Sequence, residues 1–105
     1  MPDAARGEVW LVDLGMAAKV RPCLVVSVPF ADEDRALVTL LPPTTATRGS
    51  RFEVAVPTRF LRSGAFDAQN VVTIPAGKLI RRLGRLEDKG FETVEGKLRE
   101  WLGMA

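Results

Sequence analysis

Apolar residues along the chain fall into short runs with the spacing of β-strands. Residues 51–56 alternate between polar and apolar positions, so their apolar side chains share one face of a predicted strand. Residues 23–28 form a short apolar run after Pro22, which is typical of a strand buried on both faces. Residues 57–68 show neither pattern, and we expect them to be irregular. The chain is therefore predicted to contain five or six short strands, at residues 8–14, 23–28, 36–41, 51–56, 70–74 and 79–83.

The spacing of apolar residues changes near the end of the chain. The last apolar positions recur at the three- and four-residue spacing of one helix face: Phe91, Val94, Leu98, Trp101 and Leu102. Gly90 and Gly96 each disfavour this helix by about 1 kcal/mol relative to alanine, so we expect docking onto the sheet to hold it. Gly103 is suited to cap its C-terminus. The pattern predicts a mainly β fold, a small antiparallel barrel with a C-terminal α-helix packed on it.

Length and composition narrow the functional classes. The 105 residues have room for a single domain, spanning residues 1–105. No apolar run approaches the roughly 20 residues that cross a bilayer, and the N-terminus lacks the apolar core of a secretory signal, so no membrane association is expected. Cys23 is the only cysteine, and histidine is absent. These counts exclude a Ser-His-Asp triad, argue against a metal site and fit the reducing cytoplasm.

The charge is unevenly distributed, although the whole chain carries only +2. Residues 48–85 contain eight basic and two acidic side chains, a net charge of +6, whereas residues 1–35 and 86–105 each carry −2. Arginine dominates the basic residues, and its guanidinium makes the two-pronged contacts that suit phosphate. The central segment therefore indicates an anionic partner, RNA or DNA before others. The alternative interpretation is a solvated, arginine-rich surface.

Several short motifs follow one another in a specific order. They are RGEVWLVDL at residues 6–14, KVRPCLVVS at 19–27, PTT at 43–45, RG at 48–49, FEV at 52–54 and QNVVTI at 69–74. In order and spacing, this series resembles the MazF/PemK family of toxins from bacterial toxin–antitoxin modules, over roughly residues 6–102. The resemblance implies an SH3-like barrel with a C-terminal helix, usually assembled as a homodimer.

The resemblance also implies an activity and partners. It implies cleavage of single-stranded RNA at selected sequences, without a metal or other cofactor. It implies a cognate antitoxin, whose acidic, partly disordered C-terminal segment covers the RNA groove. The toxin is expected to bind operator DNA only through this antitoxin. This chain is accordingly expected to be an endoribonuclease toxin. Attack by the 2′-OH of the RNA would leave a 2′,3′-cyclic phosphate and a 5′-OH.

The resemblance singles out a small set of functional residues. Arg21, in the Arg-Pro step, matches the family's catalytic arginine, and its guanidinium would stabilise charge that builds on the phosphate. Thr44 matches the catalytic threonine, and its hydroxyl would hydrogen-bond the phosphate or position the 2′-OH. The alternatives are that Arg21 anchors a loop and that Thr44 caps a turn. RNA contacts are predicted for four neighbours: Lys19, Thr45, Arg48 and Arg51.

Two departures from the family pattern affect the prediction. The loop at residues 15–20 is short and lacks a glutamate that some members use, and Ala68-Gln69 replaces an Asp-Gln step. No general base is therefore marked out, and the remaining acidic candidates are Glu8, Asp13, Glu53 and Asp67. Trp10 and Phe30 are candidates for base stacking, although aromatic residues in strands more often belong to the core.

Two other functional classes remain open. A gyrase-poisoning toxin of the CcdB type shares this barrel and helix, and it would act by binding through C-terminal residues, here 101–104. Against this, Trp101 also fits the apolar face of the helix. A non-catalytic SH3-like module for nucleic acid or peptide is the third class. The chain is expected to form a homodimer, with the uncharged segment 36–41 in its interface and a further contribution from residues 60–66.

Overall fold

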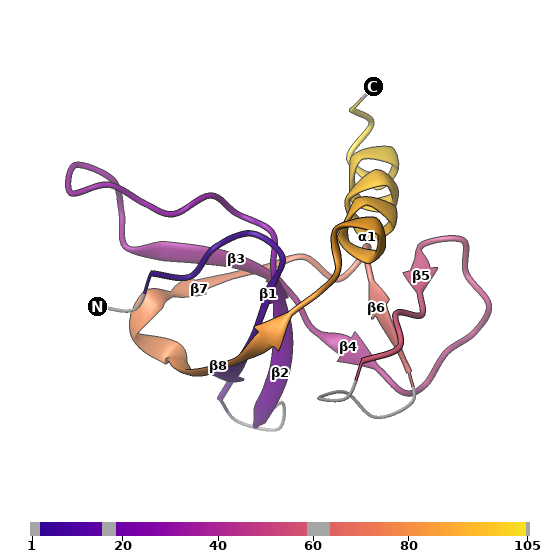
Figure 1. Ribbon diagram of the computed structural model, residues 1–105, viewed down its shortest axis with the longest axis horizontal. Coiled ribbons are helices and arrows are strands. Elements are labelled where there is room, and N and C mark those ends of the chain that lie inside the picture. Colours follow the sequence, from indigo (N-terminus) through magenta and orange to yellow (C-terminus); the bar gives the residue numbers. More distant parts are fainter. Residues whose placement is uncertain (1–2, 16–18, 59–63, 105) are drawn as a thin grey trace.

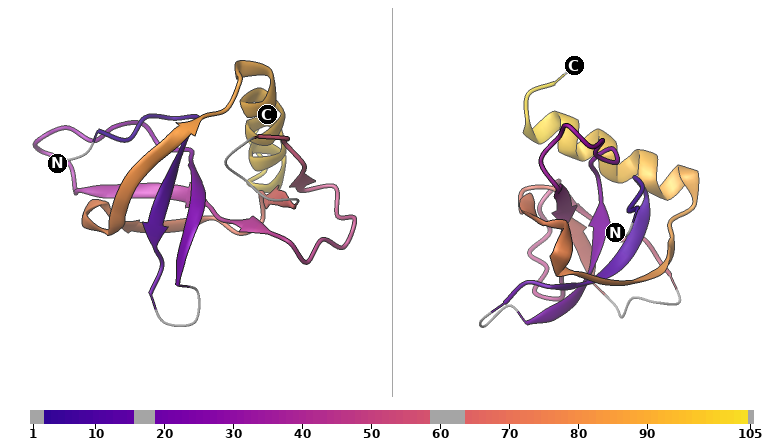
Figure 2. Two further views of the ribbon diagram at one scale, coloured as in Figure 1. Left: turned by 60° about the horizontal axis from the view of Figure 1, so that its bottom comes forward. Right: turned by 90° about the vertical axis from the view of Figure 1, so that its left-hand side faces the viewer.

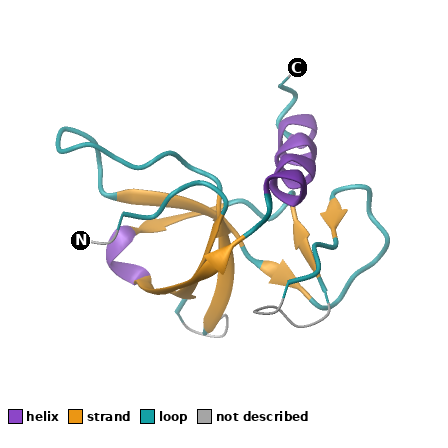
Figure 3. Cartoon of the chain, viewed as in Figure 1, coloured by secondary structure: helices purple, strands orange, loops and turns teal. Residues whose placement is uncertain are grey.

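The computed structural model describes residues 3–15, 19–58 and 64–104 as two antiparallel sheets and one helix (Figure 1). Its elements in chain order are β1 (Glu8–Asp13), β2 (Val20–Val25), β3 (Leu37–Leu41), β4 (Pro43–Thr44), β5 (Glu53–Val54), β6 (Ala65–Asp67), β7 (Val72–Pro75), the 3-10 turn η2 (Ala76–Lys78), β8 (Leu79–Arg85) and α1 (Asp88–Trp101). The prediction of a mainly β fold with a C-terminal helix is confirmed (Figure 3). Among the described residues, no helix is long and apolar enough to cross a membrane.

The strands form a five-stranded sheet in the order β7-β3-β2-β1-β8 and a three-stranded sheet in the order β4-β6-β5. The predicted fold class is confirmed, but the five-stranded sheet is not closed into a barrel, because its edge strands β7 and β8 do not pair with each other among the described residues. The three-residue turn η2 connects these two edges, and β8 pairs with β1.

The core has two parts, one on each face of the five-stranded sheet. Alternate residues of β1 and β2 face opposite ways, so Trp10 and Cys23 join one cluster while Val9 and Leu24 join the other. The second cluster also contains Phe66 of β6, together with Leu41 and the fully buried Val94 of α1. It therefore holds both sheets and the helix together. Figures 1 and 2 show α1 at the junction of the two sheets.

Helix α1 docks as predicted, although it begins at Asp88, three residues before its first periodic apolar residue. Arg6 of the N-terminal segment pairs with Glu95 and lies over the ring of Phe91, 5.1 Å from its centroid. At the other end, Gly103 adopts φ 73°, which permits Met104 N–H to donate to the Arg99 carbonyl at 2.8 Å. The prediction that Gly103 caps the helix is confirmed.

Strand boundaries differ from the predicted ones where pairing partners end. Strand β2 begins at Val20 and includes Pro22, which the sequence placed before the strand. Pro22 lies opposite Leu11 of β1, in the half of β2 that does not pair with β3. Its missing N–H therefore removes no hydrogen bond between β2 and β3. The segment predicted as a strand over 51–56 shortens to β5, and a short strand, β6, lies within the segment predicted to be irregular.

Candidate functional site

The two predicted catalytic residues lie on neighbouring strands. Arg21 is exposed in the first half of β2, and Thr44 is half-buried at the end of β4. Strand β2 pairs with β3 through Leu24 and Leu41, and β3 runs through one residue into β4. This pairing ends at Leu24 and Leu41, because β4 joins the other sheet, where it pairs with β6. Cα atoms of β2 and β4 nevertheless approach within 8 Å, so the strands that carry Arg21 and Thr44 are close in space.

The hydroxyl of Thr44 has a local partner. Its Oγ1 accepts a hydrogen bond from the Ala46 N–H at 3.1 Å, so Thr44 caps the turn that follows β4, which the sequence had offered as the alternative role. Accepting this bond leaves the hydroxyl hydrogen available to donate to a ligand. The neighbouring Thr45 is exposed. Turn capping and phosphate binding are therefore compatible in one side chain.

The loop that carries Arg48 is organised by Glu53. One carboxylate oxygen of Glu53 accepts hydrogen bonds from the backbone N–H groups of Arg48, Gly49 and Ser50, at 3.0, 2.9 and 3.1 Å. Arg48 itself is exposed. Glu53 thus has a structural role, because its carboxylate fixes the backbone that carries Arg48.

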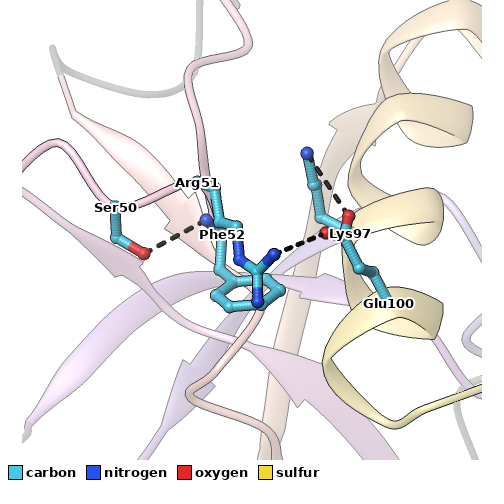
Figure 4. A network of polar contacts seen from close by, with 5 residues as sticks. All are labelled: Ser50, Arg51, Phe52, Lys97 and Glu100. Carbon is cyan, nitrogen blue, oxygen red and sulfur yellow. Dashed lines mark hydrogen bonds and ion pairs between the residues drawn. The ribbon is translucent and has the colours of Figure 1, made fainter.

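Arg51 lies against helix α1 (Figure 4). Its guanidinium sits 4.6 Å from the centroid of the Phe52 ring, and its Nη1 lies 3.2 Å from Oε1 of Glu100. The Phe52 ring in turn meets Trp101 edge-on, with centroids 5.4 Å apart. The Arg51 side chain remains 70% exposed, so most of its charge is still open to solvent. Its RNA contact stays a prediction.

Lys19 is exposed where the loop after β1 leads into β2. Its backbone adopts φ 55°. Lys19 N–H donates to the Gly15 carbonyl at 3.0 Å, and Leu14 N–H donates to the Lys19 carbonyl at 2.8 Å. These bonds fix the backbone of Lys19, two residues before Arg21. Its RNA contact also stays a prediction.

Glu8 is a buried carboxylate with three partners. Its Oε1 accepts from Ala5 N–H at 2.8 Å and from the Trp10 indole at 3.0 Å, and its Oε2 lies 3.1 Å from Arg82 Nε. Burial by itself would raise the pKa of this carboxyl, but these hydrogen bonds and the nearby arginine charges outweigh burial and hold its pKa below its ordinary value of 4.5. Glu8 is therefore suited to anchor β1 and β8 rather than to accept a proton from substrate.

The other acidic candidates are also used in local structure. Asp13 accepts from Gly15 N–H at 2.9 Å, and Asp67 accepts from Gln69 N–H at 3.0 Å, each closing a turn. Trp10 is buried in the core beside Glu8, and Phe30 is half-buried against the same cluster. The structure therefore supports a role for these aromatic residues in the hydrophobic core rather than in base stacking.

We expect Glu8→Gln to lower the free energy of unfolding at about pH 7 by about 1–3 kcal/mol, because a charge-assisted bond to Arg82 is lost. A carboxyl whose pKa is lowered on folding stabilises the fold above its unfolded pKa, and that stability is lost as pH falls through the folded pKa. Urea unfolding of wild type and variant at several pH values measures the difference. It should shrink below about pH 4.5, whereas a constant difference would contradict this role.

Cys23 is buried in the centre of the sheet and is not a nucleophile at neutral pH. Burial raises the pKa of its thiol to about 12, against a smaller opposing effect of Arg21. Within the described ranges, no three His, Cys, Asp or Glu side chains lie close enough together to hold a metal ion. The chemistry that these residues can offer is therefore that of guanidinium, ammonium and hydroxyl groups.

A separate pocket of about 670 Å³ lies between residues 54–58, which begin with the last residue of β5, and the start of α1. Arg85 and Lys89 are its basic lining residues, and Val54, Val56 and Leu86 are among its apolar ones. The residues predicted to act on RNA are not among those that line it. The candidate site is thus an exposed surface at the β2–β4 boundary rather than this pocket.

Known proteins match this sequence and this fold. A family model described as the PemK-like, MazF-like toxin of type II toxin–antitoxin systems matches residues 5–102. An endoribonuclease from a Mycobacterial species superposes with TM-score 0.80 at 26% identity, covering 99% of this chain and 95% of that one. An endoribonuclease in complex with its cognate antitoxin, also from a Mycobacterial species, gives TM-score 0.81 at 26% identity and 97% coverage of both chains.

A third solved structure supports the fold alone. It is the MazE–MazF complex (Form II) from Deinococcus radiodurans, which gives TM-score 0.82 at 23% identity over the full length of both chains. The family model covers nearly the whole sequence, and the solved structures share the fold over nearly the whole chain. The chain therefore belongs to the PemK-like, MazF-like family of toxins of type II toxin–antitoxin systems.

Proposed function

We propose that this toxin is an endoribonuclease that cleaves single-stranded RNA at selected sequences, with Arg21 and Thr44 acting on the scissile phosphate. The observation that supports the proposal is the close approach of β2 and β4, the strands that carry Arg21 and Thr44, whose Cα atoms come within 8 Å. One side chain supplies a permanent positive charge, and the other supplies a hydroxyl donor on a capped turn. Relatives named as endoribonucleases share 26% identity with the chain, which supports the same activity here.

The reaction that fits these residues is attack by the internal 2′-OH. Its oxygen forms a bond to phosphorus as its proton leaves, the bond from phosphorus to the 5′ oxygen breaks, and that oxygen takes up a proton. Negative charge builds on the phosphate oxygens in between, where the Arg21 guanidinium stabilises it. The Thr44 hydroxyl donates one further hydrogen bond. The chain needs no cofactor for this step, because the nucleophile belongs to the RNA.

Four further residues are proposed to hold the RNA strand near these two. Lys19 precedes β2, Thr45 follows Thr44, and Arg48 projects from the loop that Glu53 organises. Arg51 would contribute charge from the edge near α1, sharing its guanidinium with Glu100. Contacts between cations and successive phosphates give affinity that falls steeply with salt.

The proposed partners follow from the family and the charge. We propose a cognate antitoxin with an acidic, partly disordered C-terminal segment, which would mask Arg48 and Arg51 and compete with RNA. A relative is named as an endoribonuclease bound to its cognate antitoxin. Operator DNA would be bound only through that antitoxin, and the toxin would act in the cytoplasm.

We also propose a homodimer, at a surface that extends beyond the predicted segment 36–41. The lack of charge in residues 36–41 is explained within one chain, because β3 lies between β2 and β7 and buries Val38, Leu40 and Leu41. Large apolar side chains that stay exposed are better candidates for an interface, among them Val20, Val28, Leu37, Val71 and Ile80.

The other functional classes have less support. Gyrase poisoning would use the C-terminal residues, and Trp101 is partly engaged by Phe52 although 45% of it is exposed. A non-catalytic binding module would leave the family's catalytic pair, Arg21 and Thr44, without a use.

Cleavage of RNA in the presence of EDTA tests the proposal. We expect the purified toxin to cut a mixed-sequence single-stranded RNA equally well with and without EDTA, because the charge at the phosphate comes from Arg21 rather than from a metal ion. Gel analysis of end-labelled RNA provides the measurement. Arg21→Ala, purified in parallel, controls for a contaminating nuclease. An intact RNA under all conditions would refute the enzyme and favour a binding module.

A further inference from the structure

Gly64 approaches the backbone of Thr44 more closely than a side chain would allow. A Cβ atom added at Gly64 would lie 2.6 Å from the Thr44 carbonyl oxygen and 3.5 Å from Cγ2 of Thr45. Real Cβ atoms essentially never come so near another heavy atom, and here the obstacle is backbone, which cannot rotate away. Gly64 also has φ 149°, in the region that L side chains rarely adopt. Glycine is therefore required at this position for two independent reasons.

The contact bears directly on the site because Thr44 has little else to hold it. Strand β4 is two residues long, and Thr44 pairs with Ala65 of β6, the residue directly after Gly64. The Thr44 hydroxyl is then fixed by its bond from Ala46 N–H. The position of Thr44 relative to β2 is thus set by the backbone of residues 64–65 on one side and by its own turn on the other.

We propose that Gly64 is a positioning residue for catalysis, which seats the Thr44 hydroxyl near the strand that carries Arg21 by letting the backbones of Gly64 and Thr44 touch. This inference rests on the proposed function. A side chain at position 64 must push the Thr44 main chain away, and displacements of a few tenths of an ångström matter where a hydrogen bond has to meet a reacting phosphate. Substrate binding depends mostly on the basic residues elsewhere, so the effect falls on kcat rather than on KM.

A double-mutant cycle tests this role. We expect Gly64→Ala to lower kcat for RNA cleavage about 10-fold while KM changes less than about 3-fold. In a Thr44→Ala background, the same substitution should have little further effect, because the hydroxyl that it displaces is already gone. Gly77→Ala is the matched control, since Gly77 has no atom within 4 Å of an added Cβ, and it should retain wild-type kcat. Circular dichroism and the melting temperature confirm that each variant is folded at the assay temperature.

A second variant keeps the test decisive if Gly64→Ala does not fold. Ala65→Gly introduces no clash and loosens the pairing of β6 with Thr44, so it should lower kcat in the same direction and lose that effect in the Thr44→Ala background. Hydrogen exchange at the Ala46 amide, which bonds to Thr44 Oγ1, should accelerate in either variant. Equal losses of kcat with and without Thr44, or full activity of a folded Gly64→Ala, would overturn the proposal. An inactive wild type would instead refute the proposed enzyme itself.

Discussion

Arg21→Ala is expected to lower the rate of RNA cleavage by about 10²-fold or more, the largest effect of any single substitution in this chain. Arg21 lies in β2, which approaches β4, and its guanidinium would act most strongly when charge develops on the phosphate. Because Arg21 is exposed, the variant should fold, with a circular dichroism spectrum like that of wild type. Single-turnover cleavage of an RNA that contains the preferred sequence measures the rate.

Two companion variants sharpen the result. Arg21→Lys should restore only part of the rate, since an ammonium group keeps the charge but not the planar fork of donors. Thr44→Ala should cost less than Arg21→Ala, because one neutral hydrogen bond is lost rather than a charge. If a folded Arg21→Ala cleaved at the wild-type rate, the assignment of this arginine would fail, whatever the other variants did.

An RNA with a single 2′-deoxy nucleotide at the scissile position should not be cut at that position at all. The proposed nucleophile is the 2′ oxygen, so its removal deletes a reactant rather than weakening a contact. The products of the unmodified RNA should carry a 2′,3′-cyclic phosphate, or the 3′-phosphate formed from it, and a 5′-OH. Mass spectrometry of the fragments identifies these ends.

The same measurement distinguishes the competing chemistry. Products with a 5′-phosphate, or undiminished cleavage of the deoxy-substituted RNA, would mean that an activated water attacks the phosphate. The transesterification mechanism would then be wrong even if the toxin is a nuclease. An uncut deoxy substrate that still binds, competing with unmodified RNA, shows that the loss lies in the chemical step.

The hydrophobic pattern predicted which side chains face inward better than it predicted which residues pair. In residues 51–56 the alternation placed Phe52 and Val54 correctly in the interior, yet only two residues form β5, because the partner strand β6 is itself three residues long. Pro22 was placed outside β2 for a similar reason. Whether a proline fits within a strand depends on where the neighbouring strand ends, which no local pattern contains.

The sequence named the residues of the candidate site, but their contacts could only be seen in the structure. Strands β2 and β4, which carry Arg21 and Thr44, come close because β2 pairs with β3 and β3 continues through one residue into β4. The pairing of Arg51 with Glu100 joins residues 49 positions apart, and only the docking of α1 brings them together. Gly64 stands in a segment without period, so its close contact with Thr44 had no signal beyond the presence of a glycine.

The buried position of Cys23 also determines what thiol chemistry can report about this protein. A neutral thiol buried beside Trp10 in the first core cluster reacts with a maleimide or a disulfide reagent only when β1 and β2 separate. Since this is the only cysteine of the chain, the labelling rate is a direct readout of how often the central sheet opens. The labelling rate can be measured with and without RNA or antitoxin. A slower rate in the presence of either one would show that its binding makes the sheet open less often, and no cysteine has to be introduced for the measurement.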